Sequence, residues 1–200
     1  MEDKREAEDV QAFNLRSATY ETSIRQWLFF DRVQKTVLDL ANCDSEPESI
    51  LDVGCGTGRL LRKAKERWPN VRLLGIDPAD GMVEKARQMV PDATFYVGMA
   101  EALPLPDASL DFVVSTPSFN HWQDQEKGVQ EIARVLRPNG KFVIADIVMP
   151  LVLSKVIRHF RRNNPEKTKR IFMQAGLDVE TQRRRMARFL FVTVGKNTKT

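Results

Sequence analysis

The sequence lacks several features that mark special classes of protein. Its 200 residues include only two cysteines and two histidines, without the spacing of a zinc site. We therefore expect no disulfide framework and no metal, and a reducing, cytoplasmic location. No run of about 18 apolar residues is present, so we expect no membrane span. The charged N-terminus, Met1–Glu6, lacks the apolar segment of a signal peptide.

What the chain does contain is typical of one globular domain. Hydrophobic residues make up 42% and charged residues 29%, and 200 residues can bury a sizeable core. The net charge of +4 is uneven, because residues 151–200 hold 13 Lys and Arg but only three Asp and Glu. Such a basic region is typical either of an anion-binding surface, for example for nucleic acid, or of a solvated face. Sparse aromatic residues favour the solvated face.

The most informative stretch is Ile50–Leu60, in which three glycines stand at alternate positions. Ile50–Val53 is apolar, as in a buried strand, and a helix is predicted to begin near Arg59. Glycine lets the backbone turn and lets a ligand approach the unpaired N–H groups of that helix. The spacing differs from the G-x-G-x-x-G of dinucleotide-binding proteins. It is D-x-G-x-G-x-G, formed by Asp52, Gly54, Gly56 and Gly58.

Strands and helices alternate along most of the chain. We predict helices over residues 22–41, 60–68, 82–90 and 123–136, strands over 71–76, 94–97, 110–115 and 141–148, one or two basic helices within 151–176, and strands over 177–181 and 189–194. This order predicts an α/β fold with a mostly parallel sheet and helices on both faces. Asp77 ends the second strand, 23 positions after Gly54, where a carboxylate suits a ribose diol. Asp80 is predicted to cap the next helix.

Four motifs in this order resemble those of the class I S-adenosylmethionine (SAM) dependent methyltransferases of the small Methyltransferase-11-like type. They are Asp52–Gly58, Asp77–Met82, Gly98–Asp107 and Ser115–Trp122. The resemblance implies a Rossmann-like, doubly wound sheet of seven strands that ends in an antiparallel hairpin. It also implies SAM as the cofactor and S-adenosylhomocysteine as the product. We expect a single domain, with a helical lid over residues 1–44, a cofactor-binding core over 45–150, and a basic helix and hairpin over 151–200.

The resemblance also assigns roles to single residues. It implies that Asp52 and the glycine turn hold the amino-acid end of SAM, that Asp77 holds the ribose, and that Met82 lies against the adenine. Met99 replaces the usual Asp that accepts a hydrogen bond from adenine, so backbone groups near Ala100, shape and stacking would recognise the base. The cofactor-binding residues expected are Asp52, Gly54, Cys55, Gly56, Gly58, Asp77, Pro78, Met82, Met99, Ala100, Glu101, Ser115, Thr116 and Tyr20. For Tyr20, an ordinary packing role is an equal alternative.

The acceptor of the methyl group is left open by the sequence. In the family, the segment Ser115–Trp122 borders the reactive methyl group. His121 is the side chain in that segment that can take a proton near neutral pH, and packing or hydrogen bonding is its alternative role. We expect methyl transfer to a small or medium-sized molecule. The alternatives are methylation of RNA or protein through the basic region, and a non-catalytic SAM-binding regulatory module.

Overall fold

Seven strands form one sheet in the computed structural model, which describes residues 11, 24–41, 46–147, 164–185 and 190–198. The order across the sheet is β3-β2-β1-β4-β5-β7-β6. The pairs from β3 to β5 are parallel, whereas β7 runs antiparallel to both β5 and β6. The strands are β1 Ser49–Val53, β2 Arg72–Asp77, β3 Thr94–Val97, β4 Leu110–Ser115, β5 Leu136–Ile147, β6 Leu177–Arg185 and β7 Leu190–Asn197. The predicted fold class is confirmed.

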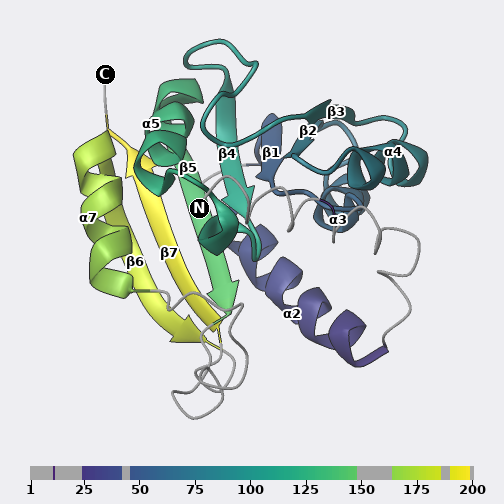
Figure 1. Ribbon diagram of the computed structural model, residues 1–200, viewed down its shortest axis with the longest axis horizontal. Coiled ribbons are helices and arrows are strands. Elements are labelled where there is room, and N and C mark those ends of the chain that lie inside the picture. The colour runs from purple at the N-terminus through teal and green to yellow at the C-terminus, as the bar shows by residue number, and fades with distance from the viewer. Residues whose placement is uncertain (1–10, 12–23, 42–45, 148–163, 186–189, 199–200) are drawn as a thin grey trace.

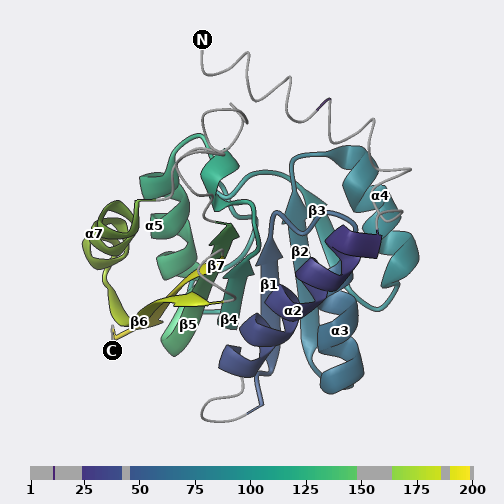
Figure 2. The same cartoon turned by 90° about the horizontal axis from the view of Figure 1, so that it is seen from below.

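Helices cover both faces of this sheet (Figures 1 and 2). One apolar core joins it to α2 Ile24–Ala41, α3 Arg59–Arg67 and α4 Asp80–Met89. A second core joins the opposite face to the short 3-10 helix η1 Phe119–His121, α5 Gln125–Val135 and α7 Pro165–Ala175. Every residue of β1 is buried, as expected for a central parallel strand between two helical layers.

Successive side chains of β1 point to opposite faces of the sheet, which places each of them in one of the two cores. Ile50 belongs to the core with α2, α3 and α4, and Leu51 and Val53 belong to the core with α5 and α7. Asp52 therefore points toward the α2 and α3 side. The topology reverses between β1 and β4, because β1 connects to β2 on one side and pairs with β4 on the other. A reversal of this kind opens a crevice at the carboxyl ends of the strands.

Several element boundaries differ from the prediction, and three of the differences have a clear cause. Asp80 is the first residue of α4 and not its cap; Ala79 precedes the helix, with its N–H already donated to Asp77. β5 begins at Leu136, five residues early, because Leu136 pairs with Leu110. β6 continues to residue 185, since its pairing with β7 reaches Leu190. None of the helices in the described ranges is both long and apolar enough to cross a membrane.

Candidate functional site

The glycine turn after β1 is attached to the end of β2. The N–H groups of Gly54 and Cys55 donate to the carbonyl oxygen of Ile76 at 2.8 and 3.1 Å. Gly54, Gly56 and Gly58 have φ angles of 77°, 51° and 79°, which are accessible to glycine with little strain. The turn therefore has a fixed position against the second strand, and α3 begins directly after it.

The three glycines have two different kinds of surroundings. A Cβ atom on Gly54 would overlap the side chain of Ser118, and one on Gly58 would come within 3.4 Å of Ala86 and Phe95. A Cβ atom on Gly56 would have no heavy atom within 4 Å among its described surroundings. Gly54 and Gly58 thus allow protein segments to pack closely, and Gly56 is the position where the backbone faces open space.

Asp77 connects the glycine turn to the start of α4. Its Oδ2 accepts the Gly56 N–H at 2.9 Å and its Oδ1 accepts the Ala79 N–H at 2.9 Å. The side chain is only 8% exposed, and this burial raises the pKa of Asp77 although the two backbone hydrogen bonds act to lower it. Each carboxylate oxygen retains a lone pair for a further donor.

Asp52 is a buried carboxylate with unused hydrogen-bonding capacity. It is 2% exposed, and its Oδ1 has no hydrogen-bond partner among the described residues. Burial, and secondarily the charge of Asp77, raises the pKa of Asp52 to about 8. A cation placed beside it would favour the ionised form and supply the missing partner.

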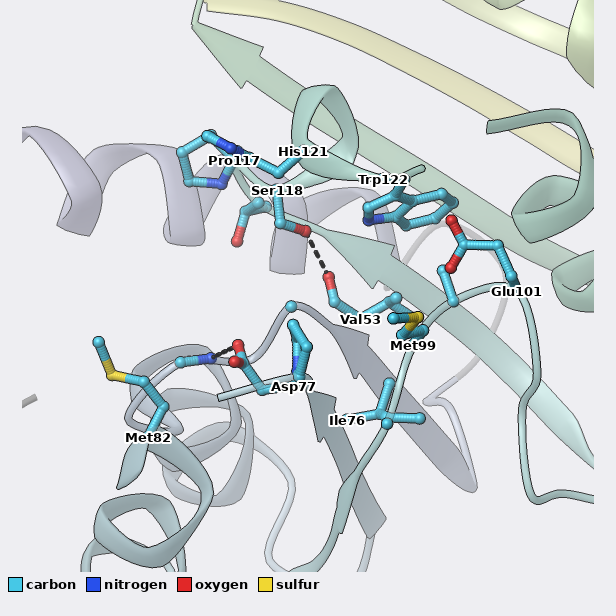
Figure 3. A pocket seen from close by; sticks show the side chains of 16 residues that line it. Val53, Ile76, Asp77, Met82, Met99, Glu101, Pro117, Ser118, His121 and Trp122 are labelled. Carbon is cyan, nitrogen blue, oxygen red and sulfur yellow. Dashed lines mark hydrogen bonds between the residues drawn. The ribbon is translucent and has the colours of Figure 1, made fainter. Parts of the chain in front are cut away.

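A cavity opens at the crevice between β1 and β4 (Figure 3). Asp77 and Met82 lie on one side of it, and Ser118, His121 and Trp122 lie on the other. The predicted residues that line it are Gly54, Gly56, Asp77, Pro78, Met82, Met99, Ala100, Glu101, Thr116 and His121. The remaining lining residues were not predicted singly, and they are Val53, Ile76, Gly98, Pro117, Ser118 and Trp122. The last three belong to the segment Ser115–Trp122, which was expected to border the reactive methyl group.

Four of the predicted cofactor residues that the structure describes do not line this cavity. Cys55 and Gly58 belong to the turn itself, and Cys55 is a buried free thiol whose pKa is raised by burial. Ser115 is fully buried at the end of β4, behind Ser118. Asp52 lies within β1, one residue before the lining residue Val53. Tyr20 lies outside the described residues.

The wall opposite Asp77 is built by the loop after β4. Ser118 Oγ donates to the Val53 carbonyl at 2.7 Å, and the Ser118 carbonyl accepts the His121 N–H at 2.9 Å. His121 is exposed at the rim. Trp122 is buried, with its ring 5.0 Å from Phe119 and 6.3 Å from Phe142. Ser118 was predicted only as part of the segment Ser115–Trp122, because its contact with Val53 joins residues 65 positions apart in the chain.

The chemical character of the lining is apolar and acidic. Its charged side chains in the described part of the chain are Asp77 and Glu101, and Lys and Arg are absent from it. Glu101 Oε1 accepts the N–H of Asp124, the residue that caps α5. The described residues also contain no group of three or more side chains able to bind a metal ion.

Known proteins resemble this chain in sequence and in fold. Residues 51–144 match the family model described as a methyltransferase domain, Methyltransf_11. A demethylmenaquinone methyltransferase of Thermotoga maritima is 32% identical over 117 residues, which are 58% of this chain and 51% of that protein. The chain thus spans about half the length of the curated relatives it matches.

Two solved structures share the fold over nearly the whole chain. One is a Haloferax volcanii methyltransferase in complex with the Trm112 methyltransferase activator, with a TM-score of 0.77, 24% identity, and 94% of this chain and 98% of that chain covered. The other is a SAM-dependent methyltransferase of Thermotoga maritima, with a TM-score of 0.69, 19% identity, and 94% and 99% covered. At these identities the likeness concerns the fold.

Proposed function

We propose that the chain is a class I SAM-dependent methyltransferase, because residues 51–144 match the methyltransferase-domain family, and that it transfers a methyl group from SAM to a small or medium-sized acceptor. The observation that carries the proposal is the cavity at the β1–β4 crevice, which joins the glycine turn, Asp77 and the loop after β4.

The residues around the crevice fit the chemical groups of SAM. Asp52 has a buried oxygen without a partner, which suits the ammonium of the amino-acid end of the cofactor. Gly56 faces open space, so that end can approach the backbone. Asp77 can accept the two ribose hydroxyls with the lone pairs that its backbone bonds leave. Met82 and Met99 offer polarisable contacts for the adenine ring.

The acceptor would enter beside Thr116, His121 and Trp122. SAM, when bound, supplies a methyl group on a sulfonium, a good leaving group, so the chain mainly positions the acceptor and excludes water. His121, at the rim, is the side chain suited to remove a proton from the acceptor in the course of in-line attack. Because the charged lining side chains are carboxylates, a neutral or cationic acceptor suits the cavity better than a polyanion.

Calorimetry on the full chain tests the cofactor assignment. We expect SAM and S-adenosylhomocysteine to bind and NAD not to bind, since the glycine spacing is D-x-G-x-G-x-G. Heat from NAD and none from either SAM species would refute the assignment. Incubation with labelled SAM and fractionated cell extract then identifies the acceptor, with a His121→Ala variant as the comparison for proton removal.

A further inference from the structure

Ser118 lies at the point where two strands separate (Figure 3). The register between β1 and β4 runs from Ile50 opposite Phe112 to Asp52 opposite Val114. One residue further on, the Ser118 hydroxyl donates to the Val53 carbonyl at 2.7 Å. A side chain therefore continues the connection between the two segments beyond the last ladder pair, directly before the glycine turn.

The direction of the hydrogen bonds follows from counting protons. A serine hydroxyl has one proton, and Ser118 gives its proton to Val53. In the 2.7 Å contact between the hydroxyls of Ser115 and Ser118, Ser115 must then be the donor. Both protons are used within the protein, so neither serine donates to a ligand; their role is to hold the backbone.

The side chain of Ser118 also packs against the glycine turn, and its main chain holds the start of η1. The Ser118 side chain occupies the space that a Cβ atom on Gly54 would need. The Ser118 carbonyl accepts the His121 N–H and so starts the 3-10 helix η1, after which Trp122 follows. One residue thus touches the glycine turn with its side chain and fixes the rim residue His121 with its main chain.

We propose that Ser118 is a positioning residue, which fixes the acceptor-side wall Thr116–Trp122 against the glycine turn. Its consequence for catalysis rests on the proposed function: the turn would hold SAM and the wall would hold the acceptor. In-line transfer requires reacting atoms about 3–3.5 Å apart and aligned, so the relative position of these segments sets the rate.

Hydrogen–deuterium exchange on the full chain tests the proposal, with Ser118→Ala compared with wild type. Without ligand, we expect the amides of residues 119–122 to exchange about two- to tenfold faster in the variant, the scale of one neutral hydrogen bond. With S-adenosylhomocysteine, wild type should be protected in both residues 54–58 and 119–122. In the variant, protection should remain in residues 54–58 and fall by a similar factor in 119–122.

Two further variants separate positioning from general stability. Ser109→Ala removes a hydroxyl that donates to the Pro106 carbonyl at 2.7 Å in a loop outside the cavity, and should leave the exchange of residues 119–122 unchanged. Ser118→Thr keeps the hydroxyl and should restore protection. Should Ser118→Ala prove unfolded by circular dichroism, Ser118→Cys, with its weak donor, replaces it.

The outcomes are distinguishable. Exchange of residues 119–122 that is the same in wild type and Ser118→Ala, without ligand, overturns the proposal. A variant with lower thermal stability but full protection of residues 119–122 by S-adenosylhomocysteine also overturns it, since it would show a merely structural role. If the wild-type chain binds no S-adenosylhomocysteine, the proposed function is wrong, and the ligand-free comparison alone decides the role of Ser118.

Discussion

At the scale of single residues, the glycine turn combines positions that look equivalent in sequence but differ in their surroundings. The spacing of Gly54, Gly56 and Gly58 predicted a tight turn, and all three have positive φ angles. The sequence could not reveal that Gly54 makes room for Ser118, because that contact depends on where the β4 loop lies in space. Gly56, in contrast, faces open space.

We predict that alanine at these two glycines acts on different properties. Gly54→Ala combines a positive φ angle with overlap of Ser118 and should lower the free energy of unfolding by about 2–4 kcal/mol. Gly56→Ala has the φ strain alone, about 1–2 kcal/mol, but its methyl group would enter the space for the ligand. Urea denaturation and calorimetry with S-adenosylhomocysteine measure both. Equal losses of stability would contradict the assignment of the space around Gly54.

A second prediction concerns Asp77, whose carboxylate binds two backbone N–H groups and points into the cavity. Asp77→Ala should weaken binding of S-adenosylhomocysteine by about 1.5–3 kcal/mol, the scale of lost charged hydrogen bonds. Asp80→Ala is the matched control, because Asp80 is an exposed carboxylate three residues away whose Oδ1 accepts the Gly81 N–H. An unchanged affinity in folded Asp77→Ala would place the ribose elsewhere.

At the scale of elements, the periodicity of the hydrophobic residues and the glycines and prolines between segments predicted the alternation of strands and helices. The strands β3 and β4 have the predicted bounds. Errors arose where tertiary pairing extends an element. The helix was predicted to end at Leu136, but Leu136 pairs with Leu110 of β4 and begins β5. The turn expected directly after it does include a left-handed residue, Asn139, with a φ angle of 66°. Trp122 was visible in the sequence, but its place in a row of stacked rings depends on residues 20 and 50 positions further on, Phe142 and Phe172.

This aromatic row anchors α7, and its strength can be measured. Phe172 is fully buried and stacks on Phe142 at 5.0 Å, and Gly195 leaves the space for its ring. Phe172→Ala should lower the free energy of unfolding by about 3–5 kcal/mol, because it removes a large buried ring. Met173→Ala, at the next position of the same helix, should cost less than about 0.5 kcal/mol, since Met173 is 60% exposed. Chemical denaturation of both variants provides the comparison.

At the scale of the whole molecule, buried carboxyl groups should make stability depend on pH. Burial raises the pKa of Asp52 to about 8 and that of Asp146 to about 7, and it also raises the pKa of Asp77. The folded chain therefore keeps protons that the unfolded chain releases near pH 4. Salt-bridged Asp39 and Glu131 have lowered pKa values and act oppositely. Asp39 is exposed and Glu131 is partly exposed, so solvent screening reduces both effects.

The sign of this linkage gives a prediction for the ligand-free chain. Between about pH 4 and pH 8 the folded state binds more protons than the unfolded state, so the free energy of unfolding should fall as pH rises, by at least about 2 kcal/mol. Asp52→Asn should flatten this dependence and should weaken binding of S-adenosylhomocysteine. Thermal unfolding at pH 5 and pH 8 tests both proteins. Equal slopes for wild type and variant would show that Asp52 is ionised throughout this range.

The basic residues on α7 allow the two acceptor hypotheses, a small molecule and RNA, to be tested by experiment. Lys167, Lys169 and Arg170 are exposed on α7. The Lys167 ammonium donates to Gln125 at 3.0 Å, and Gln125 donates to the Phe119 carbonyl in η1 at 3.0 Å, so the start of α7 lies close to the acceptor-side wall. RNA that followed α7 would thus reach the rim, whereas the lining beyond the rim is acidic.

We expect RNA to associate weakly and without saturation at physiological salt. Each neutralised phosphate of a single strand contributes about −0.7 to the slope of log affinity against log salt, so three contacts on α7 would give a slope of about −2. Filter binding of total RNA at two salt concentrations, with wild type and a triple alanine variant of Lys167, Lys169 and Arg170, measures that slope. Saturable, sub-micromolar binding at physiological salt that the triple variant abolishes would replace the small molecule by RNA as the acceptor, because α7 would then deliver the strand to His121.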